Sequence, residues 1–71
     1  MTFKDKMNDM LEDEASGAKE YNELAGLVND LEGLDDGTKV IIVTSLESIA
    51  KDEQKHFDML KAIESIINIK E

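Results

Sequence analysis

The chain has 71 residues, no proline, cysteine, tryptophan or arginine, and a formal charge of −9 from 17 acidic and 8 basic residues. This length holds one small domain, the lack of cysteine excludes disulfides and cysteine-ligated zinc, and the charge argues against nucleic acid, which requires clustered basic residues. No apolar run approaches the roughly 18 residues of a membrane span and there is no signal-peptide core, so we expect a cytoplasmic protein without membrane contact.

The first predicted element is a helix over about residues 3–32. Thr2 is a suitable N-cap with Asp5 as the capping-box acid, and Gly33 suits the position after the helix. Spacings of three and four residues predict one buried face, formed by the row Met7, Met10, Glu14, Gly17, Tyr21, Leu24, Val28 and Leu31. Glu14 is the one charged residue of this row. Gly17, one turn later, either makes room beside the carboxylate or only permits close helix packing.

A turn follows at residues 33–37, Gly-Leu-Asp-Asp-Gly, which is the strongest turn signal in the chain. Asp35 or Asp36 is expected to cap a second helix that runs from about residue 36 to about 69. The β-branched run 40–43 would suit a strand, but a single strand has no pairing partner and the helical spacing continues through it. The second helix has its own apolar row, consisting of Ile42, Leu46, Ile49, Glu53, His56, Leu60, Ile63 and Ile67.

Both predicted helices also carry apolar residues beside these rows, namely Leu11, Ala18, Ala25, Ala50, Phe57 and Ile66. Two antiparallel helices have only one face in contact with each other, so the additional apolar surface needs a second hairpin to cover it. We therefore predict an all-α fold in which residues 1–71 form one antiparallel two-helix hairpin, and this hairpin dimerises into a four-helix bundle. The wide apolar stretch near the C-terminus, with Ile63, Ile66, Ile67 and Ile69, also fits a higher homo-oligomer.

The polar interruptions of the two rows indicate a metal site. Glu53 and His56 share one helix face because they are three residues apart. Glu14 lies about as far before the turn as these two lie after it, so all three reach the same level in a hairpin. A Glu from each of two helices and a Glu-x-x-His from each of the other two is the ligand set of di-iron bundles. This ligand chemistry favours iron or manganese over calcium, and zinc is compatible with it.

These motifs resemble those of the ferritin-like superfamily. Leu11-x-x-Glu14-x-x-Gly17-x-x-x-Tyr21 is similar to the first-helix motif of rubrerythrins and ferritins, with Gly17 where alanine is common. Glu53-x-x-His56 is similar to the second-helix motif, and the two-helix length is similar to that of the half-ferritins, notably encapsulated ferritin.

The resemblance implies a ferritin-like four-helix bundle with a di-iron centre shared across a homodimer. Its metal ligands would be Glu14, Glu53 and His56, with Tyr21 as a further catalytic residue near the iron. The implied activity is that of a ferroxidase, which oxidises Fe(II) with O₂ or peroxide. The resemblance also implies an encapsulin shell as a partner, although no addressing tail is visible in the sequence that ends at Glu71.

An alternative function is that of a metal-free hairpin dimer with a structural or partner-binding role. A lone histidine or glutamate on an apolar face is more often a hydrogen-bonded core residue or a device that sets helix register. A small RNA-binding two-helix dimer conflicts with the acidic charge. The sequence contains no Ser/His/Asp or Cys/His arrangement and no glycine-rich phosphate loop.

Overall fold

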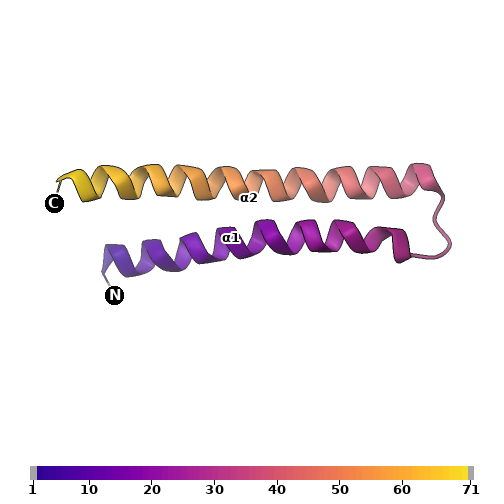
Figure 1. Ribbon diagram of the computed structural model, residues 1–71, viewed down its shortest axis with the longest axis horizontal. Coiled ribbons are helices and arrows are strands. Elements are labelled where there is room, and N and C mark those ends of the chain that lie inside the picture. The colour runs from indigo at the N-terminus through magenta and orange to yellow at the C-terminus, as the bar shows by residue number, and fades with distance from the viewer. Residues whose placement is uncertain (1, 71) are drawn as a thin grey trace.

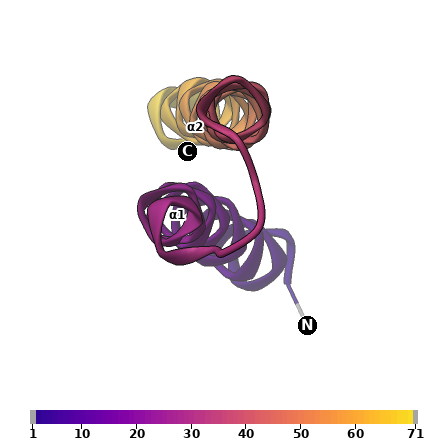
Figure 2. The same cartoon turned by 90° about the vertical axis from the view of Figure 1, so that its right-hand side faces the viewer.

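The computed structural model describes residues 2–70, and the side chains of residues 2–68. It contains α1 (Phe3–Leu27), a short 3₁₀ helix η1 (Val28–Asp30) and α2 (Asp36–Lys70). The two long helices lie antiparallel and side by side, and both chain ends lie at the same end of the molecule (Figure 1). The end-on view shows α1 and α2 stacked against each other, and the described residues form no further layer over either helix (Figure 2). The predicted all-α hairpin is confirmed. Glu71, at the chain end considered for an encapsulin address, lies outside the described residues.

The capping box predicted at the start of α1 is confirmed. The backbone N–H of Asp5 donates to Thr2 Oγ1 over 3.1 Å, and the Thr2 N–H donates to Asp5 Oδ2 over 3.3 Å. These two bonds satisfy donors that have no partner within the helix. The local sequence therefore determines where α1 begins.

The end of the first helix differs from the prediction, since α1 ends at Leu27 and not at residue 32. Residues 28–30 tighten into η1, and Leu31 is extended, with ψ at 132°. Asn29 and Asp30 are weak helix formers because their side chains compete for backbone hydrogen bonds. Gly33 has φ of 82°, which only glycine adopts readily, but it lies within the turn and does not directly follow the helix. The turn accordingly occupies residues 31–35.

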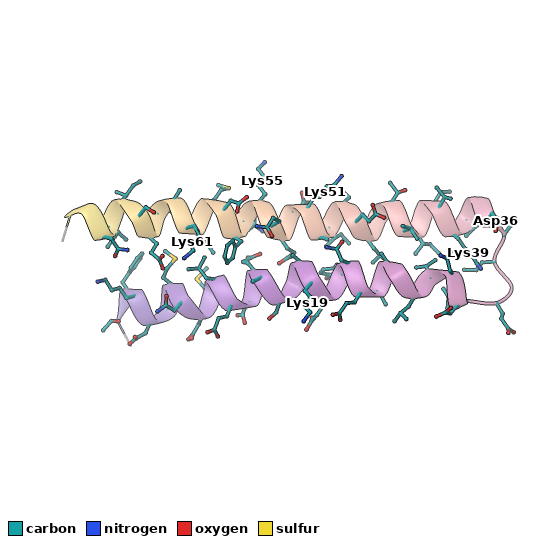
Figure 3. All side chains as sticks on the ribbon, viewed as in Figure 1. Lys19, Asp36, Lys39, Lys51, Lys55 and Lys61 are labelled. Atoms are coloured by element: carbon teal, nitrogen blue, oxygen red, sulfur yellow. The ribbon has the colours of Figure 1, made fainter. Side chains whose placement is uncertain are left out.

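The start of α2 is held by contacts on both sides of the turn. Asp35 is the N-cap, and its Oδ1 accepts from the Thr38 N–H over 2.7 Å. The Lys39 ammonium reaches from α2 to η1, where it donates to the Asn29 carbonyl over 3.1 Å (Figure 3). Because the last carbonyls of a helix lack internal partners, this bond satisfies one of them. The Asp35 carboxylate and the Asn29 carbonyl thus both have partners within the chain.

The core between the helices is thin. The buried side chains are Met7, Leu11, Ala18, Ala25, Val28 and Ala50. Three of them are alanines that lie beside the predicted rows, and small side chains let two helices approach closely. Many larger apolar side chains are left exposed. We call Met10, Leu24, Ile49 and Ile63 the apolar face; each is between 39% and 49% exposed.

Each predicted row therefore combines residues from two neighbouring strips of its helix, one that faces the other helix and one that is exposed. Met7 and Val28 face α2 as expected, whereas Met10 and Leu24 belong to the exposed apolar face. Within the described residues, neither helix combines the length and the hydropathy that a membrane crossing requires.

Candidate metal centre

Three side chains with metal-binding chemistry meet at the middle of the hairpin. Glu14 comes from α1, and Glu53 and His56 come from consecutive turns of α2. One ligand atom of each lies within 4.8 Å of those of the other two. The prediction that the three reach the same level is confirmed, although α1 is shorter than expected. Their level is retained because η1 continues the chain from α1 before the turn begins (Figure 1).

The contact between Glu14 and His56 leaves hydrogen-bonding capacity unused. His56 Nδ1 lies 3.5 Å from Glu14 Oε2, which is long for a hydrogen bond. Glu14 Oε2 is buried and has no hydrogen-bond partner in the described part of the chain. A buried acceptor without a donor costs the full desolvation penalty of that group. The hairpin alone therefore leaves one carboxylate oxygen in need of a proton or a cation.

Glu53 completes the cluster with a second carboxyl group. A hydrogen bond with the Glu14 side chain raises the pKa of Glu53, and burial and the negative charge of Glu14 raise it further. The nearby His56 acts in the opposite direction. Two carboxyl groups at this separation favour a state in which they share a proton. A divalent cation replaces such a proton well because both oxygens then face positive charge.

Gly17 makes room for Glu53. A Cβ atom built on Gly17 would lie 2.8 Å from Glu53 Oε2 and 3.2 Å from its Cδ. The carboxyl group of α2 thus rests directly against the backbone of α1. Of the two explanations considered for Gly17, space for a carboxylate is the one that this contact supports, and the carboxylate belongs to Glu53 on the opposite helix.

Tyr21 lies outside this cluster. It is half-buried on α1, two turns after Glu14 on the same side of the helix. Within the described residues its hydroxyl group has no hydrogen-bond partner. Its role near a bound metal stays a prediction.

The cluster opens toward the apolar face. A hollow of about 260 Å³ beside it is lined by Met10, Glu14, His56, Met59, Leu60 and Ile63. Met59 was not singled out from the sequence, although its place three residues after His56 puts it on the same side of the helix. A hollow on another side of the hairpin has no large apolar side chain in its lining, which consists of Ala18, Asn22, Glu47, Ala50, Lys51 and Gln54. The site therefore lies on the side of the hairpin that exposes apolar residues.

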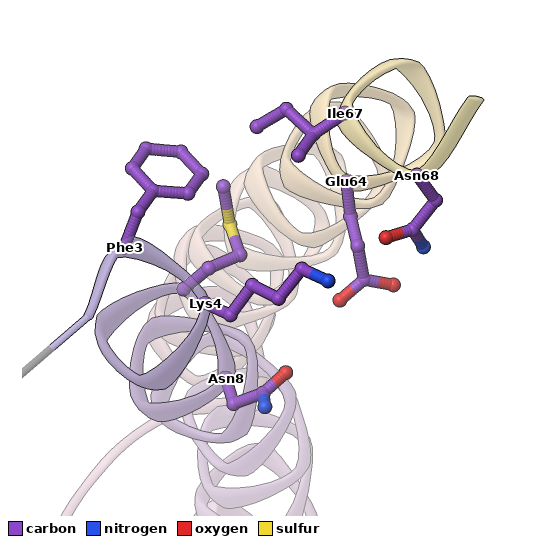
Figure 4. Close-up of a pocket in the computed structure, with 7 residues that line it drawn as sticks. Phe3, Lys4, Asn8, Glu64, Ile67 and Asn68 are labelled. Carbon is purple, nitrogen blue, oxygen red and sulfur yellow. The ribbon is translucent and has the colours of Figure 1, made fainter. Parts of the chain in front are cut away.

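A further hollow, also about 260 Å³, lies between the start of α1 and the last turns of α2. Figure 4 shows Phe3, Lys4 and Asn8 on α1 facing Glu64, Ile67 and Asn68 on α2. Lys61 Nζ lies 3.1 Å from Glu64 Oε1 and forms an ion pair with it. In the described part of the chain, the one group of three or more metal-ligand side chains is the cluster of Glu14, Glu53 and His56.

The residues present fit a metal of the iron, manganese or zinc type. Two carboxylates and one imidazole are ligands that these ions accept, and Glu14 Oε2 lacks a hydrogen-bond partner. One hairpin offers three ligands, which is fewer than a dimetal centre requires. No protein-family model, curated protein or solved structure matches this chain. The resemblance to the ferritin-like superfamily accordingly stays a prediction from the motifs.

Proposed function

We propose that this chain is a ferritin-like di-iron protein that oxidises Fe(II) at a site shared between two copies of the hairpin. The observation that carries the proposal is the meeting of Glu14, Glu53 and His56, with a buried Glu14 oxygen that has no hydrogen-bond partner. A second copy of the cluster would double the ligand set to four carboxylates and two imidazoles. That set is the one found in di-iron four-helix bundles.

The exposed surface of the hairpin supports a second copy. Its accessible area is 5414 Å² at a mass of 7.9 kDa. A compact monomer of that mass exposes roughly 4,400 Å². The excess is about 1,000 Å², close to the roughly 800 Å² that each partner buries in a standard protein interface. Folding also costs about 1–2 kcal/mol of backbone entropy per residue, which a thin core rich in alanine offsets poorly. Burying this surface against a partner of its own size would therefore stabilise the hairpin.

The apolar face is the surface on which this partner would dock. Met10 and Leu24 flank Gly17 at intervals of two helical turns, and Ile49 and Ile63 flank His56 in the same way. The candidate metal centre thus lies in the middle of the apolar face. A two-fold axis through this face would bring both clusters into one core, surrounded by apolar side chains that exclude water.

The chemistry follows from the ligands. Bound iron would supply one-electron redox chemistry: two Fe(II) ions release two electrons, which with two protons reduce O₂ to H₂O₂, or reduce peroxide to water. The carboxylates of Glu14 and Glu53 neutralise the charge of the cations, and His56 provides a neutral nitrogen ligand. The acidic surface of the chain, with a net charge of −9, raises the local concentration of cations.

The direct test is the rate of Fe(II) oxidation in air, followed by optical absorbance. We expect the wild type to accelerate oxidation over buffer and to bind about two irons per dimer. Glu53→Ala and His56→Ala should each abolish the acceleration. Glu20→Ala is the matched control, because Glu20 is an exposed carboxylate on α1. Equal rates for buffer, wild type and all variants would refute the proposal and favour the metal-free structural hairpin.

A further inference from the structure

We propose that Gly17 is a positioning residue of the metal site, whose missing side chain sets the place of the Glu53 carboxylate; the inference rests on the function proposed above. α1 contains two glycines with different surroundings. A Cβ on Gly17 would meet the Glu53 carboxyl group, whereas a Cβ on Gly26 would meet nothing within 4 Å. Only one of the two therefore carries a contact with the candidate ligands.

Close helix packing alone does not account for Gly17. The buried row of the hairpin already uses Ala18, Ala25 and Ala50, so an alanine methyl group fits between these helices. Glycine within a helix lowers the folding equilibrium constant about fivefold relative to alanine. The atom closest to a Cβ at Gly17 is Glu53 Oε2, at the far end of a flexible side chain. A methyl group there would therefore displace the carboxylate and leave the helices in place.

The size of that displacement matters for a metal ligand. Ordinary contact with a Cβ begins at 3.4 Å, and the built distance is 2.8 Å, so the oxygen would move by about 0.6 Å. Metal–ligand distances tolerate deviations of about 0.2 Å. Loss of groups that orient a metal ligand typically lowers metal affinity 10- to 100-fold. We expect a loss of this size for Gly17→Ala.

The first experiment measures Co(II) affinity under exclusion of air, using the absorption bands of the bound ion and a competing chelator. Co(II) binds nitrogen and oxygen ligands more tightly than Fe(II), and it reports on ligand geometry. Gly17→Ala should bind Co(II) at least tenfold more weakly than the wild type and show altered bands. Gly26→Ala, which makes the same chemical change in the same helix, should remain within about twofold of the wild type.

The second experiment needs no metal. Denaturation is followed in the presence of chelator at one protein concentration, for Gly17→Ala in the wild type and in Glu53→Ala. With residue 53 shortened, Gly17→Ala should strengthen folding about fivefold, as expected for a helical glycine replaced by alanine. With Glu53 present, the gain should be smaller because the methyl group competes with the carboxylate. Gly26→Ala should give the same gain in both backgrounds.

The outcomes separate the two proposals. A wild type that takes up Co(II), together with a Gly17→Ala variant that binds it equally tightly, would overturn the role of Gly17 and leave the metal site standing. Equal gains from Gly17→Ala in both backgrounds would also overturn it. A wild type that binds no Co(II) would refute the metal site, and with it the role of Gly17.

Discussion

The pKa of a carboxyl group is lowered at the turn of the hairpin and raised in its middle. At the turn, Asp35 accepts a hydrogen bond from the Thr38 backbone, and this donor lowers the pKa of Asp35. In the middle, Glu53 faces the carboxyl group of Glu14, and the hydrogen bond between the two raises the pKa of Glu53. A carboxylate next to a donor is stable when charged, whereas a carboxyl group next to another favours a bound proton.

This contrast shows where the chain leaves a buried polar atom without a partner. At the turn, Asp35 Oδ1 accepts from the Thr38 N–H, and the nearby Asn29 carbonyl accepts from Lys39. In the middle, Glu14 Oε2 is buried without a hydrogen-bond partner among the described residues. Asp35 at the turn therefore has its partner within one chain, whereas the middle leaves a buried carboxylate oxygen for which we propose a second chain and cations.

The largest effect is expected from a charge on the apolar face. Ile63→Glu would place a carboxylate in the proposed interface, next to the hollow that contains Glu14 and His56. The dimer, and with it most of the helical structure, should be lost at micromolar concentration, because burying an unpaired charge costs several kcal/mol. Light scattering and circular dichroism measure both changes.

Ala62→Glu is the matched control for this change, since Ala62 is an exposed neighbour on α2. This variant should leave the mass of the oligomer in solution and its helix content unchanged. A wild type that is a folded monomer at micromolar concentration, or an Ile63→Glu variant of unchanged mass, would contradict the shared site.

The next largest effect is expected on the free energy of unfolding, when cations are added or when the three candidate ligands are replaced. A metal that binds only the folded state at 100 times its dissociation constant stabilises it by about 2.7 kcal/mol per independent site. Replacing Glu14, Glu53 and His56 together by Leu or Ala should stabilise the metal-free protein, because it removes interacting carboxyl groups from the core. Thermal unfolding of both proteins, each with chelator and with Zn(II), tests this. A wild type indifferent to Zn(II) and more stable than the triple variant would show that these residues are structural.

The smallest effect is expected in the pH dependence of stability of the metal-free protein. Glu53 in the middle of the hairpin and Asp35 at the turn should change the stability in opposite directions as the pH rises. Because the pKa of Glu53 is raised, its favourable contribution is complete below about pH 4.3 and is lost as the pH rises through the raised pKa. Because the pKa of Asp35 is lowered, its contribution is complete above about pH 3.9 and is lost as the pH falls through the lowered pKa.

Urea denaturation with chelator across this pH range checks both signs. Glu53→Gln, which cannot ionise, should reduce the loss of stability on the alkaline side and leave the acid side unchanged. Asp35→Asn should alter only the acid side. A Glu53→Gln variant with the same profile as the wild type would contradict the contact between the two carboxyl groups.

Much of the fold and the candidate site was accessible from the sequence because it depends on local rules. The Thr2 capping box, the Asp35 cap and the shared face of Glu53 and His56 each depend on residues three apart. The level of Glu14 followed from counting residues on either side of the turn. The predicted end of α1 lies five residues beyond the observed one at Leu27, because Asn29 and Asp30 have weak helix propensity.

The sequence by itself determined two capped helices, each with two neighbouring apolar strips, and the level at which three candidate ligands meet. Which strip packs inside the hairpin was decided only by the tertiary structure. Both strips have the same spacing and similar hydropathy. They differ in side-chain size, which sets how closely the backbones of two helices can approach when that strip lies between them. The strip with Ala18 and Ala25 faces α2 and leaves Met10 and Leu24 exposed. The contact of Gly17 with Glu53 was decided in the same way, because it joins two helices whose separation no local pattern encodes.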